Sequence, residues 1–134
     1  MIRAATPDDT AAVLSVWAQA RSAAAVTPDT TASVASVLAH DALLVAEVDG
    51  EIVGAIIAGW DGWRGNLYRL AVLPSYRRRG TARALVEAAH ARLRALGAVR
   101  VTALVGLDED DARALWLASG YAFDPEIARF VRDL

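Results

Sequence analysis

The order of hydrophobic patterns along the chain predicts a mixed α/β fold, in which helices pack on a mostly antiparallel sheet. Apolar stretches with a helical period alternate with short β-prone stretches. A strand, a loop, a long amphipathic helix and another strand follow one another over residues 66–105, which implies a parallel crossover in an otherwise antiparallel sheet. Because 134 residues without repeats or linkers are typical of one domain, we expect residues 1–134 to form a single domain.

The N-terminal third predicts one strand and two helices. Residues 2–5 form the expected strand. Thr6 and Pro7 predict the start of the first helix, because a hydroxyl can cap free N–H groups and proline fits the first helical turn. After a loop-like stretch at residues 22–29, a second helix is expected at residues 30–40.

A hairpin and a third strand are predicted next. Residues 42–48 and 52–58 are apolar and β-prone, and the Asp49-Gly50 dipeptide near their junction is a strong signal for a tight turn. Residues 59–65 predict a second turn, which contains two tryptophans, and residues 66–72 predict the third central strand.

The C-terminal half predicts two helices separated by a strand. Residues 81–96 carry an apolar face at helical spacing, and Gly97 supplies the C-terminal stop. Residues 99–105 are expected to be a buried strand and residues 108–119 a short helix. For the rest of the chain we expect one or two short strands around Pro125.

The composition excludes several classes of function. The absence of Cys excludes disulfide scaffolds, thiolate zinc sites and Cys nucleophiles. The two histidines are His40 at a helix end and His90 on a polar helix face, where exposure is expected, so no metal centre is expected. A formal net charge of -2 disfavours nucleic-acid binding. No apolar run reaches the roughly 20 residues of a membrane span, and the N-terminus has early acids instead of a signal core. We expect a cytoplasmic protein that binds neither nucleic acid nor membrane.

The loop between the third central strand and the long helix carries the clearest chemical signal. Gly80 and Ala82 stand two residues apart at the predicted helix N-terminus. Small residues let the backbone approach a ligand, and the free N–H groups and the helix dipole favour a bound phosphate. Arg77, Arg78 and Arg79 add positive charge, although a solvated basic loop before an ordinary helix remains the alternative.

Two motifs resemble the GNAT superfamily of acyl-CoA-dependent N-acyltransferases. Arg77-x-x-Gly80-x-Ala82 is similar to its Q/R-x-x-G-x-G/A pyrophosphate signature, and the flanking strand and helix match as well. Near the C-terminus, Ala112-x-x-Leu115-Trp116-x-x-x-Gly120-Tyr121 is similar to the second motif, A-x-x-L-Y-x-x-x-G-F. The resemblance covers nearly the whole chain. It implies the GNAT fold, a central mixed sheet with helices on both faces and a parallel strand pair that splays apart.

The resemblance implies acetyl-CoA as cosubstrate. Backbone N–H groups of residues 77–82, Thr81 among them, would hold the pyrophosphate. Leu70, Ala71 and Val72 would pair with the pantetheine arm like an added strand, and the Val72 N–H would face the thioester oxygen as an oxyanion donor. Trp116 would pack beside the pantetheine or in the core. The implied reaction is direct attack of a primary amine on the acyl carbon in a ternary complex.

Proton transfer in this reaction has several candidates. Trp116 stands where the family often has a tyrosine, the acid that protonates the thiolate, and an indole N–H cannot serve as an acid. Tyr121, Tyr76 and water are the alternatives. Asp61 and then Tyr68 are candidates for the base, with a water chain as a further alternative. Asp61 could equally cap its turn.

Three tryptophans and one arginine are candidates for acceptor binding. Trp17, Trp60 and Trp63 could line a pocket or hold a cationic amine, or they could cover a sheet edge or a dimer contact. Arg64 could bind an acceptor carboxylate or lie on the surface. The surrounding Trp-Asp-Gly-Trp-Arg-Gly-Asn-Leu-Tyr segment resembles a bacterial subgroup of small GNAT proteins whose substrates are poorly defined.

Other functions remain open beside N-acetyl transfer. A non-catalytic GNAT module could bind acyl-CoA as a sensor or an assembly subunit. A nucleotide or phosphate binder of another kind could use the same loop, although the chain has no lysine and no G-x-x-x-x-G-K-S/T pattern. A nucleic-acid binder built on the three arginines is disfavoured by the net charge. The apolar tail and the edge strands also allow a homodimer.

Overall fold

In the computed structural model, which describes residues 1–20 and 27–134, five strands form one sheet in the order β1-β2-β3-β4-β5. Neighbouring strands are antiparallel except for the parallel pair β4–β5. The strands are β1 (Ile2–Ala4), β2 (Leu43–Val48), β3 (Glu51–Trp60), β4 (Gly65–Val72) and β5 (Val101–Ala103). The helices are α1 (Thr10–Gln19), α2 (Thr31–Ala39), α3 (Thr81–Leu96) and α4 (Asp110–Ala118), with short 3-10 turns η1 (Pro7–Asp9) and η2 (Pro74–Tyr76).

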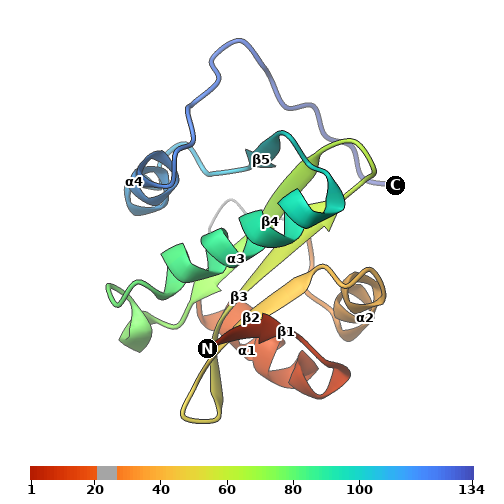
Figure 1. The fold of residues 1–134 in the computed structure, drawn as a ribbon, viewed down its shortest axis with the longest axis vertical. Coiled ribbons are helices and arrows are strands. Elements are labelled where there is room, and N and C mark those ends of the chain that lie inside the picture. The colour runs from red at the N-terminus through yellow and green to blue at the C-terminus, as the bar shows by residue number, and fades with distance from the viewer. Residues whose placement is uncertain (21–26) are drawn as a thin grey trace.

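Helices cover both faces of the sheet, as the predicted fold class requires. Helix α3 lies on one side, and α1 and α2 lie on the other (Figure 1). Two strand glycines let α3 approach closely: a Cβ at Gly65 would stand 2.8 Å from Leu93, and one at Gly54 would stand 3.0 Å from Leu85. The core is almost entirely aliphatic on both sides of the sheet. These contacts fix α3, and hence its N-terminus, relative to the end of β4.

Local signals account for most of the element boundaries. Asp49 and Gly50 both have positive φ, +51° and +79°, as the tight turn of a two-residue hairpin requires. Thr30 caps α2, because its Oγ1 accepts the Ser33 N–H at 3.0 Å. Gly97 ends α3 in the left-handed conformation. The loop expected at residues 22–29 lies largely outside the described residues.

Two boundaries were predicted wrongly. Gly59, Trp60 and Gly65 were expected in a turn, but Trp60 pairs with Gly65 across the β3–β4 hairpin, so only residues 61–64 form the turn. Glycine is unfavourable in strands, so residue preferences predict a turn here. The glycines of this segment nevertheless remain in the hydrogen-bonded ladder between β3 and β4. Strand β5 is shorter than the predicted residues 99–105, because Val99 is 96% exposed and pairing with β4 stops at Ala103.

The predicted C-terminal strands are absent from residues 121–134, all of which the structure describes. The tail runs as an arch from α4 to the C-terminus (Figure 1). Its large apolar side chains at residues 123, 127, 130, 131 and 134 are exposed and do not follow the strict alternation of a half-buried strand. Pro125 also removes a ladder donor. None of the described helices is both long and apolar enough to cross a membrane.

Candidate functional site

The two parallel strands separate after three paired residues. Pairing runs from Gly65↔Val101 to Leu67↔Ala103 and then stops. Strand β4 continues to Val72, and among the described strands only β3 pairs with it there. The edge of β4 that faces away from β3 is therefore open beyond Leu67, and an extended ligand could pair with it as an added strand.

A β-bulge interrupts the pairing of β4 with β3 along this part of the strand. Ala55 pairs with Ala71 and Ile57 with Tyr68, so Arg69 and Leu70 together stand opposite Ile56. Arg69 adopts the left-handed conformation, with φ of +53°. Bulges bend a strand and end its pairing, and they are frequent beside active sites.

The open edge presents polar groups of Val72. The Leu73 N–H donates to the Val53 carbonyl at 2.8 Å and so points toward β3. Because successive residues of a strand point their N–H groups to opposite edges, the Val72 N–H points to the open edge. The Val72 carbonyl, on the same edge, accepts the Nε–H of Arg77 at 3.2 Å. Leu70 is half-buried, and Ala71 and Val72 are buried.

The loop after η2 turns its amide groups outward. Arg78 and Gly80 have positive φ, +59° and +81°, and Gly80 is the N-cap of α3. In the described part of the chain, no hydrogen bond takes the N–H groups of Arg78, Arg79, Gly80 or Thr81. A Cβ at Gly80 would meet nothing within 4 Å. Outward N–H groups at a helix N-terminus form a concave nest that suits a phosphate group.

Aromatic and acidic groups hold this loop in place. The Arg79 guanidinium lies over the Tyr76 ring at 5.2 Å, and the Tyr76 hydroxyl donates to Glu51 at 3.3 Å. Arg77, Arg78 and Arg79 are exposed, and Ala82 is half-buried at the start of α3. The predicted loop residues thus lie together at the end of β4.

Trp116 and Tyr121 form one cluster with His90. The Trp116 ring is buried and meets Tyr121 edge-on at 4.9 Å. The Tyr121 hydroxyl lies 2.7 Å from Nε2 of His90. Burial raises the pKa of Tyr121 to about 12 and lowers the pKa of His90. The prediction that His90 is exposed was wrong: its side chain is 13% exposed because it packs against the chain after α4.

Asp61 caps its turn through one carboxylate oxygen. Its Oδ1 accepts the N–H groups of Trp63 at 2.8 Å and Arg64 at 2.7 Å. These two bonds lower the pKa of Asp61, so the carboxylate is a weaker base than an ordinary aspartate. These contacts agree with the alternative role of Asp61, which is to cap its turn. Tyr68, the other base candidate, is 43% exposed.

The tryptophans expected at the acceptor side lie in three different environments. Trp17 is 3% exposed, and its Nε1–H donates to the Arg69 carbonyl at 3.0 Å. At this exposure the ring offers almost no surface for contact with an acceptor. Trp60 is half-buried, and Trp63 is 72% exposed with the Arg64 guanidinium 4.6 Å from its ring centre.

Sequence reasoning missed the ion pair that Arg69 makes. Its Nε lies 2.9 Å from Oδ1 of Asp29, and its Nη2 donates to the Thr27 carbonyl. The only available signal was one charged residue inside an otherwise apolar strand. Nothing in the sequence places Asp29, 40 positions earlier, beside it.

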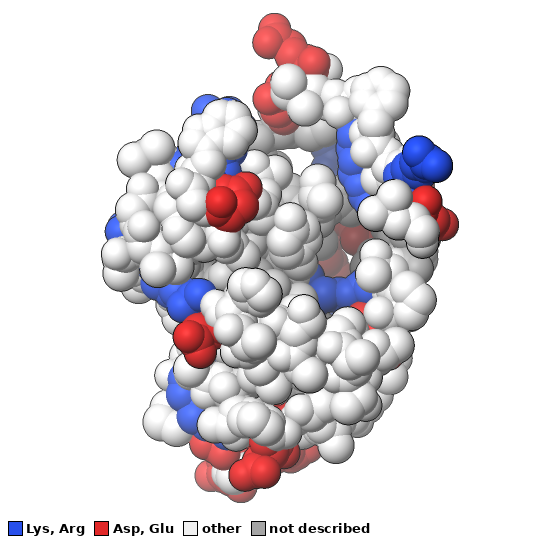
Figure 2. All heavy atoms as spheres, turned by 90° about the vertical axis from the view of Figure 1, so that its right-hand side faces the viewer, with Lys and Arg blue, Asp and Glu red and all other residues white. Residues whose placement is uncertain are grey.

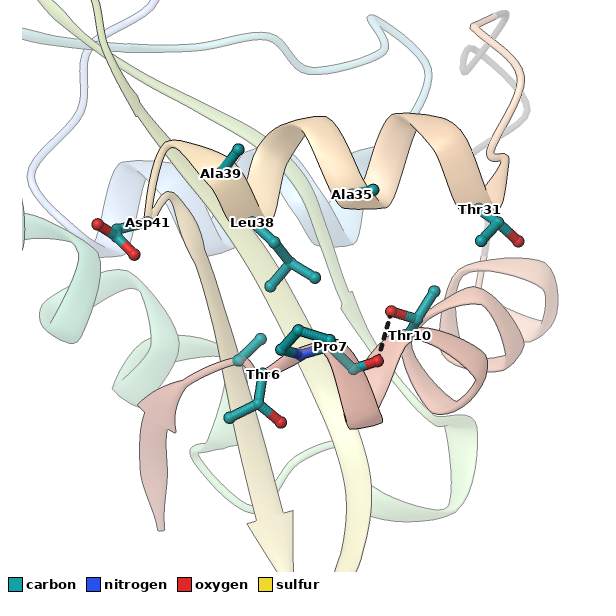
Figure 3. Close-up of a pocket in the computed structure, with 9 residues that line it drawn as sticks. Thr6, Pro7, Thr10, Thr31, Ala35, Leu38, Ala39 and Asp41 are labelled. Atoms are coloured by element: carbon teal, nitrogen blue, oxygen red, sulfur yellow. Dashed lines mark hydrogen bonds between the residues drawn. The ribbon is translucent and has the colours of Figure 1, made fainter.

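Cavities in the described residues lie apart from the open edge. One of about 590 Å³ lies between α2 and the chain around η1 (Figure 3). It contains none of the predicted site residues. A second, of about 440 Å³, is lined by His90, Tyr121 and the end of α3. Among the described residues, no three His, Asp or Glu side chains are grouped to hold a metal ion.

Charges on the face shown in Figure 2 are interspersed. Acidic and arginine side chains alternate with uncharged ones there, without one extended basic surface.

Comparison with known proteins identifies the class. The model of the acetyltransferase (GNAT) family matches residues 12–121, most of the chain. The chain belongs to this family.

Individual relatives agree with this class. An acetyltransferase of Pectobacterium atrosepticum is 46% identical over 70 residues, 52% of this chain and 50% of the relative. One of Sodalis glossinidius is 47% identical over 70 residues, 52% and 49% of the two chains. These matches span about half the length of the curated relatives.

Solved structures share the fold. A putative acetyltransferase from Agrobacterium tumefaciens has a TM-score of 0.76 at 21% identity and covers 99% of both chains. The aminoglycoside N-acetyltransferase AAC(6')-Iy, in complex with a bisubstrate analogue, has a TM-score of 0.80 at 21% identity over 100% of this chain and 97% of that one. A ribosomal-protein-alanine N-acetyltransferase from Brucella melitensis has a TM-score of 0.76 at 21% identity, covering 90% and 83%.

Proposed function

We propose that the protein transfers an acetyl group from acetyl-CoA to a primary amine by direct attack in a ternary complex. The observation that carries this proposal is the open edge of β4, which leads into the outward amide groups before α3. Acetyl-CoA has an extended arm with two amides and a pyrophosphate at its far end. One molecule can therefore use the strand edge and the amide nest together.

Each part of the proposed site has a distinct task. The N–H groups of residues 78–82 hold the pyrophosphate, and the surrounding arginines neutralise its charge. The backbone of Leu70 and Val72 pairs with the pantetheine arm. The Val72 N–H points to the edge where the thioester carbonyl lies and stabilises the oxyanion that forms there.

The proposed chemistry is acyl transfer without a covalent enzyme intermediate. The amine nitrogen attacks the carbonyl carbon, the new C–N bond forms, and the C–S bond breaks with release of CoA thiolate. The amine loses a proton and the thiolate gains one. Most of the rate enhancement comes from holding the two substrates in reactive geometry.

The proton carriers are the least constrained part of the proposal. The lowered pKa of Asp61 and its two backbone bonds favour Tyr68 or water as the base. The hydroxyl of Tyr121 is held by His90, and that of Tyr76 by Glu51, which favours water as the thiolate's proton source. Because CoA thiolate is a tolerable leaving group, turnover does not require an amino-acid acid.

The acceptor is proposed to bind near the β3–β4 turn. Trp60, Trp63 and Arg64 lie there. Structural neighbours include an aminoglycoside N-acetyltransferase and a ribosomal-protein-alanine N-acetyltransferase. A small cationic amine or a protein amino group are therefore the classes to test. We further propose that residues 1–134 act as one domain in the cytoplasm. Whether two copies form a homodimer is to be tested separately.

Binding and turnover are tested in sequence. Calorimetry with acetyl-CoA, and with CoA and ATP as competitors, is expected to give micromolar affinity, effective competition by CoA and weak competition by ATP. An amine panel that includes spermidine, an aminoglycoside and an alanine-terminated peptide is then assayed by thiol release. Absence of acetyl-CoA binding contradicts the proposal.

A second candidate is a non-catalytic acyl-CoA-binding module. Two observations favour it: Trp116 replaces the family's tyrosine, and Asp61 is engaged in its turn. Tight acetyl-CoA binding without thiol release across the amine panel supports this candidate over the enzyme.

A further inference from the structure

The last two turns of α3 form one wall of a cavity that the proposed reaction does not use. The cavity has a volume of about 440 Å³ and lies between α3, the start of β5 and the chain after α4. Arg94 lines it from α3, Arg100 from the segment that enters β5, and Tyr121 from the third element. Arg94 lies about 20 Å along the helix from Thr81 in the amide nest. The cavity is therefore separate from the proposed acyl-CoA site.

This cavity carries positive charge without a counter-charge. Arg94 and Arg100 line it, and none of the described residues that line it is an acid. Within the described parts of the chain, no carboxylate forms an ion pair with either guanidinium. Arg3 and Arg69, by contrast, each contact a carboxylate. Because two positive charges on one concave surface attract an anion, a bound anion would stabilise this arrangement.

The C-terminus of α3 opposes an anion only weakly. A helix end carries about half a negative charge on its free carbonyl groups. The Arg94 carbonyl is occupied, because it accepts the Gly97 N–H at 3.0 Å. The Leu93 carbonyl accepts the Ala98 N–H at 2.9 Å. The full charges of the two arginines therefore outweigh the partial charge of the helix end.

His90 lines the same cavity and senses its charge. Its Nε2 lies 2.7 Å from the Tyr121 hydroxyl, and its Nδ1 lies 3.9 Å from a Glu87 carboxylate oxygen. Burial lowers the pKa of His90, Glu87 raises this pKa, and the Arg94 guanidinium lowers it. Because the charge of Arg94 affects the imidazole, an anion bound to Arg94 should affect it too, and should raise the pKa of His90.

We propose that this cavity is a second binding site, which takes a small oxyanion between Arg94 and Arg100. Guanidinium groups bind carboxylates and phosphates alike through paired N–H donors, so the ligand class is a small molecule with one of these groups. The volume of the cavity lies within the range of small-molecule sites, roughly 300–1,000 Å³. This inference does not depend on the proposed acetyl transfer.

NMR spectroscopy tests the site directly, because the chain has two histidines and gives only two sets of imidazole signals. His40→Gln assigns these signals, and His40 of the wild-type chain is an internal reference because it does not line the cavity. Sulfate is the first probe, titrated at constant ionic strength, since its charge stays fixed while histidine titrates. We expect a saturable shift of the His90 signals, with a Kd on the order of 1 mM, and a raised pKa of His90.

Two variants locate the bound sulfate. Arg94→Gln and Arg100→Gln should each weaken sulfate binding by about tenfold, because each removes a charge-assisted interaction. Arg83→Gln is the matched control, at an exposed arginine of the same helix that does not line the cavity. Denaturant unfolding checks that all three variants fold. A wild-type His90 signal that ignores sulfate, or a response that persists unchanged in both cavity variants, would overturn the proposal.

Further titrations identify the ligand class and separate the two proposals. Inorganic phosphate and succinate, measured in the same way, show whether the site prefers a phosphate or a carboxylate. Saturating acetyl-CoA should leave the sulfate Kd unchanged, because the amide nest lies at the other end of α3. Displacement of sulfate by acetyl-CoA would contradict a second site. Loss of acetyl-CoA binding with an intact sulfate response would contradict only the proposed function.

Discussion

The two ends of the proposed site are built in different ways. At the loop before α3, the ligand would meet backbone N–H groups, which depend on Gly80, Ala82 and the helix start. At the β3–β4 turn, the ligand would meet side chains such as Trp63 and Arg64, which contact each other through the guanidinium and the indole ring. A backbone site leaves a short motif in the sequence, whereas a side-chain site does not.

The largest expected effect tests the backbone site. Ala82→Asp places a negative charge beside the proposed pyrophosphate and should weaken acetyl-CoA binding by about 100-fold, or ~2.7 kcal/mol. Ala91→Asp, on the exposed face of the same helix, is the control and should change the Kd little. Gly80→Trp fills the open space above the nest and should act like Ala82→Asp. Survival of acetyl-CoA affinity in both loop variants would show that the nest is assigned wrongly.

A stability variant outside both regions separates folding from binding. Asp9 accepts two bonds from Arg3, at 2.7 and 2.9 Å, and these hold its pKa near 2, below the ordinary 3.8. This pair stabilises the fold above pH 4 and loses its contribution as pH falls toward 2. Asp9→Asn should therefore lower the free energy of unfolding at pH 7 by about 1–2 kcal/mol and flatten its acid slope.

Denaturant unfolding at several pH values measures this effect. Calorimetry should meanwhile find an unchanged acetyl-CoA Kd for Asp9→Asn. An Asp9→Asn variant with wild-type stability at pH 7 contradicts the stabilising role of the Arg3–Asp9 pair. A variant with weakened acetyl-CoA binding would show that the pair also affects the proposed binding site.

A smaller effect is expected at Trp116, where this chain differs from the second family motif. Trp116→Tyr restores a hydroxyl that can donate a proton, and kcat should rise by about two- to fivefold if thiolate protonation limits turnover. Trp116→Phe removes the indole without adding a hydroxyl and serves as the control. Equal kcat values for the two variants would argue that water already protonates the thiolate efficiently.

The smallest effect is expected at Asp61. Asp61→Ser keeps a side-chain acceptor for the N–H groups of the turn but abolishes the carboxylate, so kcat should change by less than about threefold. The pH–rate profile should keep its acidic limb, because the lowered pKa of Asp61 lies below the range in which an amine is assayed. A loss of activity with a missing acidic limb would instead make Asp61 the base.

The sequence predicted more of the donor side than of the acceptor side. The loop at residues 77–82, the strand before it and the α3 helix follow from local patterns, and the structure places all three as expected. His90 shows the limit of such patterns. Its helical position predicts exposure, yet the residues after α4 cover it, 31 positions further along the chain.

The sequence by itself indicated the family, the order of the elements and the loop proposed to bind an anion, because each depends on short-range periodicity or on small residues at fixed spacing. Only the tertiary structure decided where the bulge falls, that Trp17 supports Arg69, and that Arg69 contacts Asp29. The tertiary structure also shows that residues 121–134 form no strand. These features depend on which distant segments meet, and the pairing of residues 40 or 50 positions apart is set by packing of the whole core and not by local preference.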